Sequence, residues 1–249
     1  MSSDFAFDDG LIQAARRAQR VVALSGAGIS AESGIPTFRD AQKGLWAEFD
    51  PMELATPEAF ERNPKFVWDW YAMRRQEMVE VEPNAGHYAL ANWAQRCSDF
   101  SVVTQNVDGL HQRAGSEQVI ELHGSLLQVR CSAEEHKVVD DWLELPDEVP
   151  RCAHCEAYLR PNVVWFGEML PMGALLRAEE VVATADLVLS IGTSSLVQPA
   201  AQLPYRALKA GVTVVEINPD ETPLTADATY SLRGPAGQVL PALLAALSH

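Results

Sequence analysis

Short apolar runs alternate with amphipathic stretches along most of the chain, and the two patterns predict strands and helices in turn. The apolar runs predict buried strands over residues 21–24, 100–104, 118–122, 187–191 and 212–217. Hydrophobic residues at helical spacing predict helices over residues 11–18, 84–96, 173–185, 199–210 and 237–247. Asp9 is the expected N-cap residue of the first helix. This alternation is typical of an α/β fold, in which helices cover both faces of a parallel sheet.

Two stretches do not fit the alternation. Residues 36–81 are helical and aromatic in pattern, whereas residues 125–161 are polar, interrupted by prolines and contain three of the four cysteines. Both stretches lie between predicted strands. We therefore expect one domain over residues 1–249, with a smaller lobe built from insertions at about residues 36–81 and 125–161.

Charge and composition exclude several classes of partner. The formal net charge is −15 at pH 7, which leaves no basic face for a nucleic-acid backbone and favours cationic or lysine-bearing partners. No apolar run approaches the length of a membrane span, and Asp4, Asp8 and Asp9 lie where a targeting peptide carries basic residues. We expect a cytoplasmic protein that binds neither nucleic acid nor membrane.

A glycine-rich turn follows the first predicted strand. Gly26 and Gly28 permit a tight turn and the close backbone approach that a pyrophosphate requires. However, Gly34 and Pro36 interrupt the helix that should follow, and no strand precedes the position where a hydride-transferring enzyme carries its ribose-binding acid. The turn indicates dinucleotide binding for a purpose other than hydride transfer.

Polar or glycine-rich residues follow each predicted strand, and ligands of open α/β sheets bind at these ends. They lie at residues 26–30, 105–108, 123–124, 192–194 and 218–220. His123 ends a strand and has an ordinary pKa near neutrality, so it can accept a proton from a ribose hydroxyl, although a lone histidine is more often structural. Asn106 and Asp108 either orient a ligand or cap a helix that opens at Gly109.

Taken in order, these motifs resemble those of the sirtuins, which are NAD-dependent protein-lysine deacylases. The resemblance rests on residues 26–30, 34–40, 104–111, 123–124, 163–168 and 192–194. It implies a Rossmann-like domain, a small lobe with a helical module and a zinc module, and NAD consumed as a co-substrate. Loss of nicotinamide leaves a ribose carbon that the acyl oxygen attacks, and a base then activates a ribose hydroxyl.

The resemblance also implies roles for individual residues. His123 is the expected general base, with Asn106 and Asp108 placing the ribose and the nicotinamide amide. Phe38 is expected to shield the reacting carbon from water. The other expected contacts to NAD are Arg39, Gln105, Gly26, Ala27, Gly28, Ile35, Val107, Gly192, Thr193, Ser194, Asn218, Pro219, Asp220 and Ala236.

Two further segments are expected to bind an acylated lysine presented on an extended peptide. The first pairs with the peptide backbone as an added strand and comprises Val164, Trp165, Phe166, Gly167 and Glu168. The second is the pair Tyr71 and Arg74, which lie on one face of a predicted helix. From composition alone we expect both side chains to lie on the solvent-exposed surface. However, the pair resembles the Tyr-x-x-Arg pair of desuccinylase-type sirtuins, which recognises an acidic acyl tail.

The cysteines depart from the family pattern. Sirtuins commonly have two Cys-x-x-Cys pairs, whereas here Cys152 and Cys155 form a complete pair and Cys131 stands without a second cysteine. A structural zinc then needs a fourth ligand, for which Glu134, Glu135 and His136 are candidates; otherwise the lobe holds together without metal.

We therefore predict NAD-dependent removal of succinyl, malonyl or acetyl groups from protein lysine, with nicotinamide and O-acyl-ADP-ribose as products. Two alternatives remain open at this stage. One is mono-ADP-ribosyl transfer, which uses the same cleavage of NAD with another acceptor. The other is a non-catalytic module that senses NAD or ADP-ribose, although such a module would not require a base at the ribose.

Overall fold

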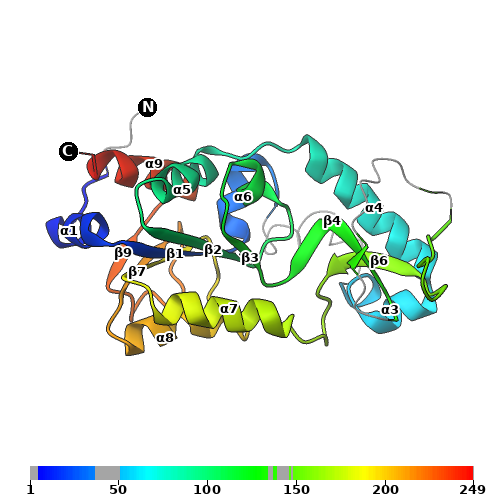
Figure 1. The fold of residues 1–249 in the computed structure, drawn as a ribbon. Coiled ribbons are helices and arrows are strands. Elements are labelled where there is room, and N and C mark those ends of the chain that lie inside the picture. Colours follow the sequence, from blue (N-terminus) through cyan, green and yellow to red (C-terminus); the bar gives the residue numbers. More distant parts are fainter. Residues whose placement is uncertain (1–4, 37–50, 134–136, 139–145, 147, 249) are drawn as a thin grey trace.

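A six-stranded parallel sheet forms the larger part of the molecule (Figure 1). The computed structural model describes residues 5–36, 51–133, 137–138, 146 and 148–248. The strand order is β3-β2-β1-β7-β8-β9, with bounds β1 (Arg20–Ser25), β2 (Asp99–Thr104), β3 (Val119–Glu121), β7 (Leu187–Ile191), β8 (Thr213–Ile217) and β9 (Tyr230–Leu232). The predicted α/β fold and all five predicted strands are confirmed. Strand β9 was not predicted, because three residues are too short to show a hydrophobic period.

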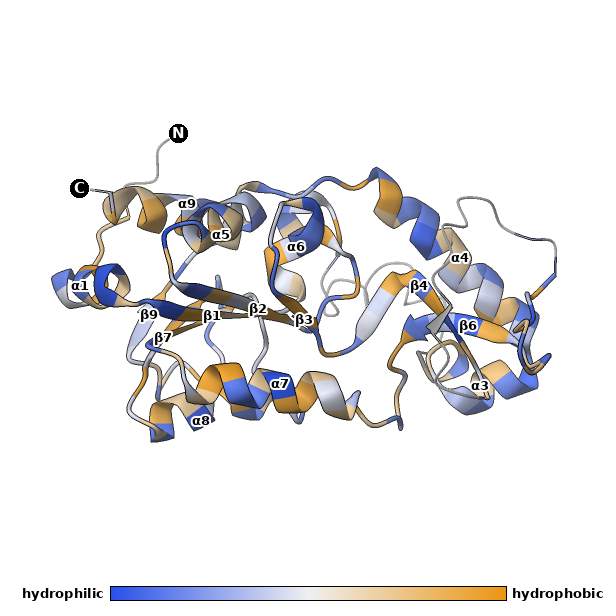
Figure 2. Cartoon of the chain, viewed as in Figure 1, coloured by the Kyte–Doolittle hydropathy of each residue, from blue (hydrophilic) through white to orange (hydrophobic). Residues whose placement is uncertain are grey.

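Helices cover both faces of this sheet. One face carries α1 (Asp9–Arg17), α5 (Ala85–Ala94) and α9 (Ala236–Ala246), and the other carries α7 (Met172–Ala183) and α8 (Leu203–Lys209). Alternate residues of β1 enter different cores: Val21 and Ala23 pack under α1, α5 and α9, whereas Val22 and Leu24 pack under α7 and α8. Figure 2 shows the resulting pattern on α7, where hydrophobic and hydrophilic residues alternate along the helix.

Two predicted helix boundaries need correction. Asp8, and not Asp9, is the N-cap of α1, because Asp8 has the extended backbone of a cap and its carboxylate accepts the Gly10 N–H at 2.7 Å. The helix predicted over residues 199–210 is divided into the 3₁₀ helix η4 (Ala200–Gln202) and α8. None of the described helices is long and apolar enough to cross a membrane.

The inserted stretches contribute a smaller, separate core at one end of the molecule (Figure 1). It contains η3 (Pro51–Glu53), α3 (Pro57–Arg62), α4 (Pro64–Glu80) and a three-stranded antiparallel sheet of β4 (Gly124–Cys131), β5 (Lys137–Val138) and β6 (Leu159–Val163). The helical pattern predicted for the first insertion is confirmed over residues 51–80, the part in which the structure describes helices. The second insertion forms strands that its polar composition concealed, because an antiparallel sheet with one solvated face tolerates polar residues.

Candidate functional site

The ends of strands β1 and β7 are packed directly against each other. The Gly28 N–H donates to the Gly192 carbonyl at 2.8 Å, and a Cβ on Gly28 would lie 2.6 Å from the Gly192 Cα. Gly192 has a φ of +57°, which favours glycine. The expected need for glycine at Gly26 and Gly28 therefore has a structural cause: a side chain at either position would meet the turn that follows β7.

The turn after β1 forms the 3₁₀ helix η1 (Ala27–Ser33), which ends at Gly34 with a φ of +88°. This confirms that the helical pattern stops there. Asn84, the N-cap of α5, supports η1 by donating its amide to the Ile29 carbonyl at 2.7 Å and to Ser33 at 3.0 Å. Sequence reasoning did not identify this support, because Asn84 is distant in sequence and looks like an ordinary cap.

Side-chain hydrogen bonds join three strand ends into one edge. Gln105, after β2, donates its amide to the Thr193 hydroxyl at 3.1 Å, and Asn218, after β8, donates to the Thr193 carbonyl at 3.0 Å. The sheet thus brings together three of the polar positions predicted from strand ends. The order β2-β1-β7-β8 explains this, because all these strands run in one direction and end at one edge.

Ser30 links the two polar residues that follow β2. The Ser30 hydroxyl donates to the Asp108 carboxylate at 2.7 Å and accepts from the Asn106 amide at 3.0 Å. All three residues are buried. Asp108 also accepts the Leu110 N–H at 3.0 Å at the start of α6 (Leu110–Arg113), in line with the capping alternative, although Gly109 is the N-cap residue. The sequence prediction left Ser30 without a role, although it lies within the glycine-rich turn.

The orientation of His123 determines which ring nitrogen can act. His123 Nδ1 lies 2.9 Å from the Gln105 carbonyl, which can only accept a hydrogen bond. Nδ1 must therefore carry the hydrogen, and Nε2 of the neutral ring has a free lone pair. Burial lowers the pKa of His123, while the bond to Gln105 partly offsets this. The imidazole is therefore neutral near pH 7 and able to accept a proton at Nε2.

Gly124, which follows His123, lies where β4 and β6 pair closely. It has a φ of +76°, and a Cβ there would lie 1.9 Å from the Asn162 carbonyl oxygen. The glycine therefore allows β4 to pair closely with β6.

Two buried histidines lie behind this edge. The His111 Nε2 is 2.8 Å from the Ser25 hydroxyl, which donates to Thr104 at 2.9 Å. The rings of His87 and His111 are 4.9 Å apart in an edge-to-face arrangement. Burial lowers the pKa of His87 to about 4 and that of His111 to about 3, so both rings are neutral.

The remaining expected NAD contacts differ in accessibility. Phe38 and Arg39 lie outside the described residues. Ile35 is buried, and Ala236 is buried at the start of α9. The others are half-buried or exposed on loops at strand ends and comprise Ala27, Val107, Ser194, Pro219 and Asp220.

The segment after β6 is a closed turn rather than a free strand edge. Gly167 has a φ of +87°, and the Glu168 N–H donates back to the Trp165 carbonyl at 3.1 Å. The N–H groups of Val164 and Phe166 donate to the carbonyls of His123 and Ala55, both at 2.9 Å. A peptide that pairs with this segment as an added strand therefore cannot use these three N–H groups, because each already donates to a carbonyl of this chain.

Tyr71 is buried, so the prediction from composition that it lies on the surface is wrong. Its hydroxyl accepts the Trp165 indole N–H at 3.0 Å, and burial raises its pKa. Arg74 is half-buried, with its Cζ 5.5 Å from the centre of the Trp70 ring. The Arg74 Nε has no hydrogen-bond partner among the described residues, but it forms an ion pair with the Glu77 carboxylate at 3.6 Å.

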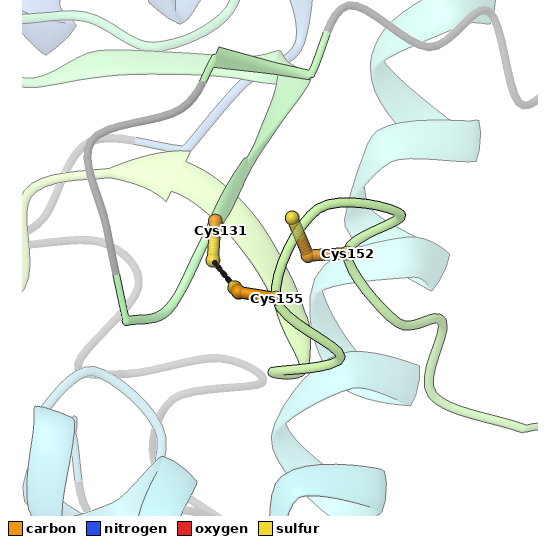
Figure 3. A group of neighbouring side chains, drawn as sticks. All are labelled: Cys131, Cys152 and Cys155. Carbon is orange, nitrogen blue, oxygen red and sulfur yellow. Dashed lines mark hydrogen bonds between the residues drawn. The ribbon is translucent and has the colours of Figure 1, made fainter.

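Three cysteines gather in the small lobe (Figure 3). The sulfurs of Cys131, Cys152 and Cys155 all lie within 4.8 Å of one another. Tetrahedral zinc with sulfur ligands at about 2.3 Å requires sulfurs at such separations, so the three thiols fit a structural zinc. The candidates for a fourth ligand, Glu134, Glu135 and His136, lie outside the described residues. Cys97, apart from this cluster, is half-buried.

Comparison with known proteins identifies the family. The family model described as the Sir2 family matches residues 26–199. The chain belongs to the Sir2 family. A relative from Methylococcus capsulatus, named NAD-dependent protein deacylase, is 49% identical over 97% of both chains. NAD-dependent protein deacylase 1 of Archaeoglobus fulgidus is 48% identical over 95% of this chain and 96% of its own.

Solved structures of Sir2 proteins agree with this fold. A complex of a Sir2 homologue with NAD matches with a TM-score of 0.92 and 46% identity, over 98% of this chain and 94% of that one. A Sir2 variant with a deacetylated p53 peptide and 3′-O-acetyl ADP ribose matches with a TM-score of 0.81 and 34% identity, over 95% and 96% of the two chains. The predicted sirtuin resemblance is confirmed.

Proposed function

We propose that this chain is an NAD-dependent protein-lysine deacylase that accepts acidic acyl groups, succinyl and malonyl, in addition to acetyl. Deacylation with consumption of NAD follows from membership of the Sir2 family and from the names of the relatives. The products are nicotinamide and O-acyl-ADP-ribose. We further propose that residues 1–249 act as one deacylase domain.

The observation that carries the proposal is the fixed tautomer of His123. Because Nδ1–H donates to the Gln105 carbonyl, Nε2 is the basic nitrogen. Bound NAD supplies an electrophilic ribose carbon and the ribose hydroxyls. His123 accepts the proton from one of these hydroxyls, and the lowered pKa keeps the ring unprotonated for this step.

Asn106 and Asp108 hold the ribose and the nicotinamide amide in this proposal. Their side chains are aligned by the Ser30 hydroxyl, and each has capacity for further hydrogen bonds. Because all three residues are buried, the ligand groups that they bind are shielded from water. Such shielding strengthens each hydrogen bond to the ligand.

The acidic-acyl preference rests on the positive charge around Tyr71. Burial is the largest influence on the Tyr71 phenol and raises its pKa. The positive charges of Arg160 and Arg74 lower that pKa, whereas the charge of Glu168 acts in the same direction as burial. A guanidinium with an unbonded buried Nε, beside a phenol, is suited to a carboxylate at the end of an acyl chain. Acetyl has no such carboxylate.

Zinc, where bound, has a structural function in this proposal. Cys131 at the end of β4 and the Cys152–Cys155 turn would hold it, and it would supply a cross-link within the small lobe. No catalytic step requires it.

Mass spectrometry of succinyl-, malonyl- and acetyl-lysine peptides, with and without NAD, tests the activity. We expect NAD-dependent loss of the acyl mass. An added ADP-ribose mass would indicate the transferase instead, and an unchanged peptide would favour the sensing module.

The substitution Arg74→Met tests the acyl preference. Loss of one partner from a desolvated charge pair costs about 2–5 kcal/mol, so the ratio of kcat/KM for succinyl to acetyl peptides should fall roughly tenfold or more. The matched control is Arg75→Met, which makes the same charge change one residue further along α4. Equal losses on both peptides in Arg74→Met would show that Arg74 only supports the helix.

A further inference from the structure

The side chain of Trp165 bonds to the residue proposed to contact the acyl tail. Its indole N–H donates to the Tyr71 hydroxyl at 3.0 Å. Trp165 is 3% exposed and Tyr71 6% exposed, so water does not compete for this bond. The bond joins α4 to the turn after β6, two parts of the small lobe that are distant in sequence.

Arg160 packs on the indole ring of Trp165, and Glu168 holds both Arg160 and the Trp165 backbone. The Arg160 Cζ lies 3.3 Å from the ring centre, and the Arg160 guanidinium makes two hydrogen bonds to Glu168, at 2.6 and 3.0 Å. Glu168 also accepts the backbone N–H of Trp165 at 2.8 Å. The indole therefore has one orientation, and its N–H has one direction.

A donor fixed in this way determines where the Tyr71 hydroxyl points its own hydrogen. A phenol hydrogen prefers the plane of the ring, where it can lie on either side of the oxygen. The indole N–H occupies the oxygen on one side, so the hydrogen turns away from Trp165 and is free to donate. Without the indole N–H, the Tyr71 hydroxyl hydrogen can adopt both in-plane orientations, so the hydroxyl is less well aligned to donate to a ligand.

We propose that Trp165 is a positioning residue that orients the Tyr71 hydroxyl toward the carboxylate of an acidic acyl tail, and so contributes to acyl specificity. This inference rests on the proposed preference for succinyl and malonyl groups. It assigns to the Trp165 side chain a function separate from any backbone contact with a peptide.

The turn after β6 also contacts the backbone of His123, the proposed base. The N–H of Val164, the residue before Trp165, donates to the His123 carbonyl at 2.9 Å. The backbone of the base and the side chain that orients Tyr71 are thus held by adjacent residues. This arrangement fixes the separation between the reacting end and the tail-binding end of the acyl group.

The substitution Trp165→Phe removes the N–H and keeps an aromatic ring against Phe60, whose centre is 5.4 Å from that of Trp165. We expect the succinyl-to-acetyl ratio of kcat/KM to fall about three- to tenfold, as for loss of one hydrogen bond. In a Tyr71→Phe background, Trp165→Phe should leave this ratio unchanged, because there is no hydroxyl to orient.

Three results separate the possible failures. Absence of desuccinylation in the wild type would refute the proposed acyl preference itself. Wild-type desuccinylation with equal losses on both peptides in Trp165→Phe would overturn the positioning role. An undiminished effect of Trp165→Phe in the Tyr71→Phe background would overturn it as well.

A measurement on the wild type keeps the test valid if Trp165→Phe does not fold. The assigned indole N–H resonance of Trp165 should move when a succinyl-lysine peptide binds, because its acceptor then donates to a carboxylate. An acetyl-lysine peptide should move it much less. Equal displacement by the two peptides would contradict the proposal.

Discussion

Replacing Ser30 with alanine should weaken both the fold and the proposed nicotinamide pocket. The Ser30 hydroxyl is fully buried and is the hydrogen-bond bridge between Asn106 and Asp108. Ser30→Ala removes both bonds and adds no group that can replace them. A buried amide N–H and a buried carboxylate oxygen then lose a partner, which costs more than the loss of an exposed hydrogen bond.

The magnitude follows from the two bonds. A neutral hydrogen bond contributes about 1 kcal/mol and one to a charged group about 1.5–3 kcal/mol, so Ser30→Ala should lower the free energy of unfolding by about 2–4 kcal/mol. Asp108 retains the Leu110 N–H, which limits the loss. If the misalignment of Asn106 and Asp108 also costs about 2 kcal/mol of transition-state stabilisation, the kcat/KM for NAD should fall roughly 30-fold.

Urea unfolding and exchange of labelled nicotinamide into NAD measure the two effects. Ser190→Ala is the matched control: Ser190 is 1% exposed, and its hydroxyl has no hydrogen-bond partner among the described residues. The control should not lower the unfolding free energy, because it removes a buried hydroxyl that makes no hydrogen bond. Equal destabilisation by the two substitutions, or normal exchange in Ser30→Ala, would refute the reasoning.

Three further predictions concern other parts of the molecule. His123→Ala should retain NAD binding and lose deacylation on the order of 10²-fold. It should also remove the low-pH inflection in kcat/KM that lies below the ordinary histidine pKa. Near-normal turnover in this variant would contradict the assignment of His123 as the base. Chelation of zinc, or Cys155→Ser, should lower the Tm with activity lost only as the protein unfolds; activity restored in proportion to zinc in a folded apo-protein would contradict this. Because the pKa values of His87 and His111 are lowered to about 4 and 3, the stability that depends on their neutral forms is complete above about pH 6.5 and is lost progressively as the pH falls through about 4 to about 3. Urea titrations at several pH values should show this decline, with a shallower slope in His111→Gln; parallel curves would argue against it.

The sheet could be predicted from the sequence because its strands are buried on both faces. The residues of β7 are buried without exception, and all of them except Ser190 are apolar. Strands β4 and β6 could not be recognised in this way. Residues of β4 such as Gln128 and Arg130 are half-buried, and their polar character concealed the strand.

The site was predictable where residues follow strands and hidden where distant residues bond to each other. Asn106, Asp108 and His123 were expected at one edge because parallel strands bring their carboxyl ends together there. The bridge through Ser30 depends on a contact between residues 76 and 78 positions apart, which no local pattern reports. The burial of Tyr71 was missed for the same reason, since its partner is Trp165.

The charges of the small lobe give the proposed preference for acidic acyl groups a physical basis. In a chain with a net charge of −15, Arg74, Arg130 and Arg160 lie in one region of this lobe, and Arg130 and Arg160 share the single carboxylate of Glu168. Burial lowers the pKa of Arg160, which shows that desolvation opposes its charge. Arg74 is paired with Glu77, so three guanidinium groups face two carboxylates. An acidic acyl tail beside Tyr71 would balance the remaining positive charge, whereas an acetyl group would leave it unchanged. The protein's overall charge repels such a tail, so this local reversal of sign is what the proposed specificity requires.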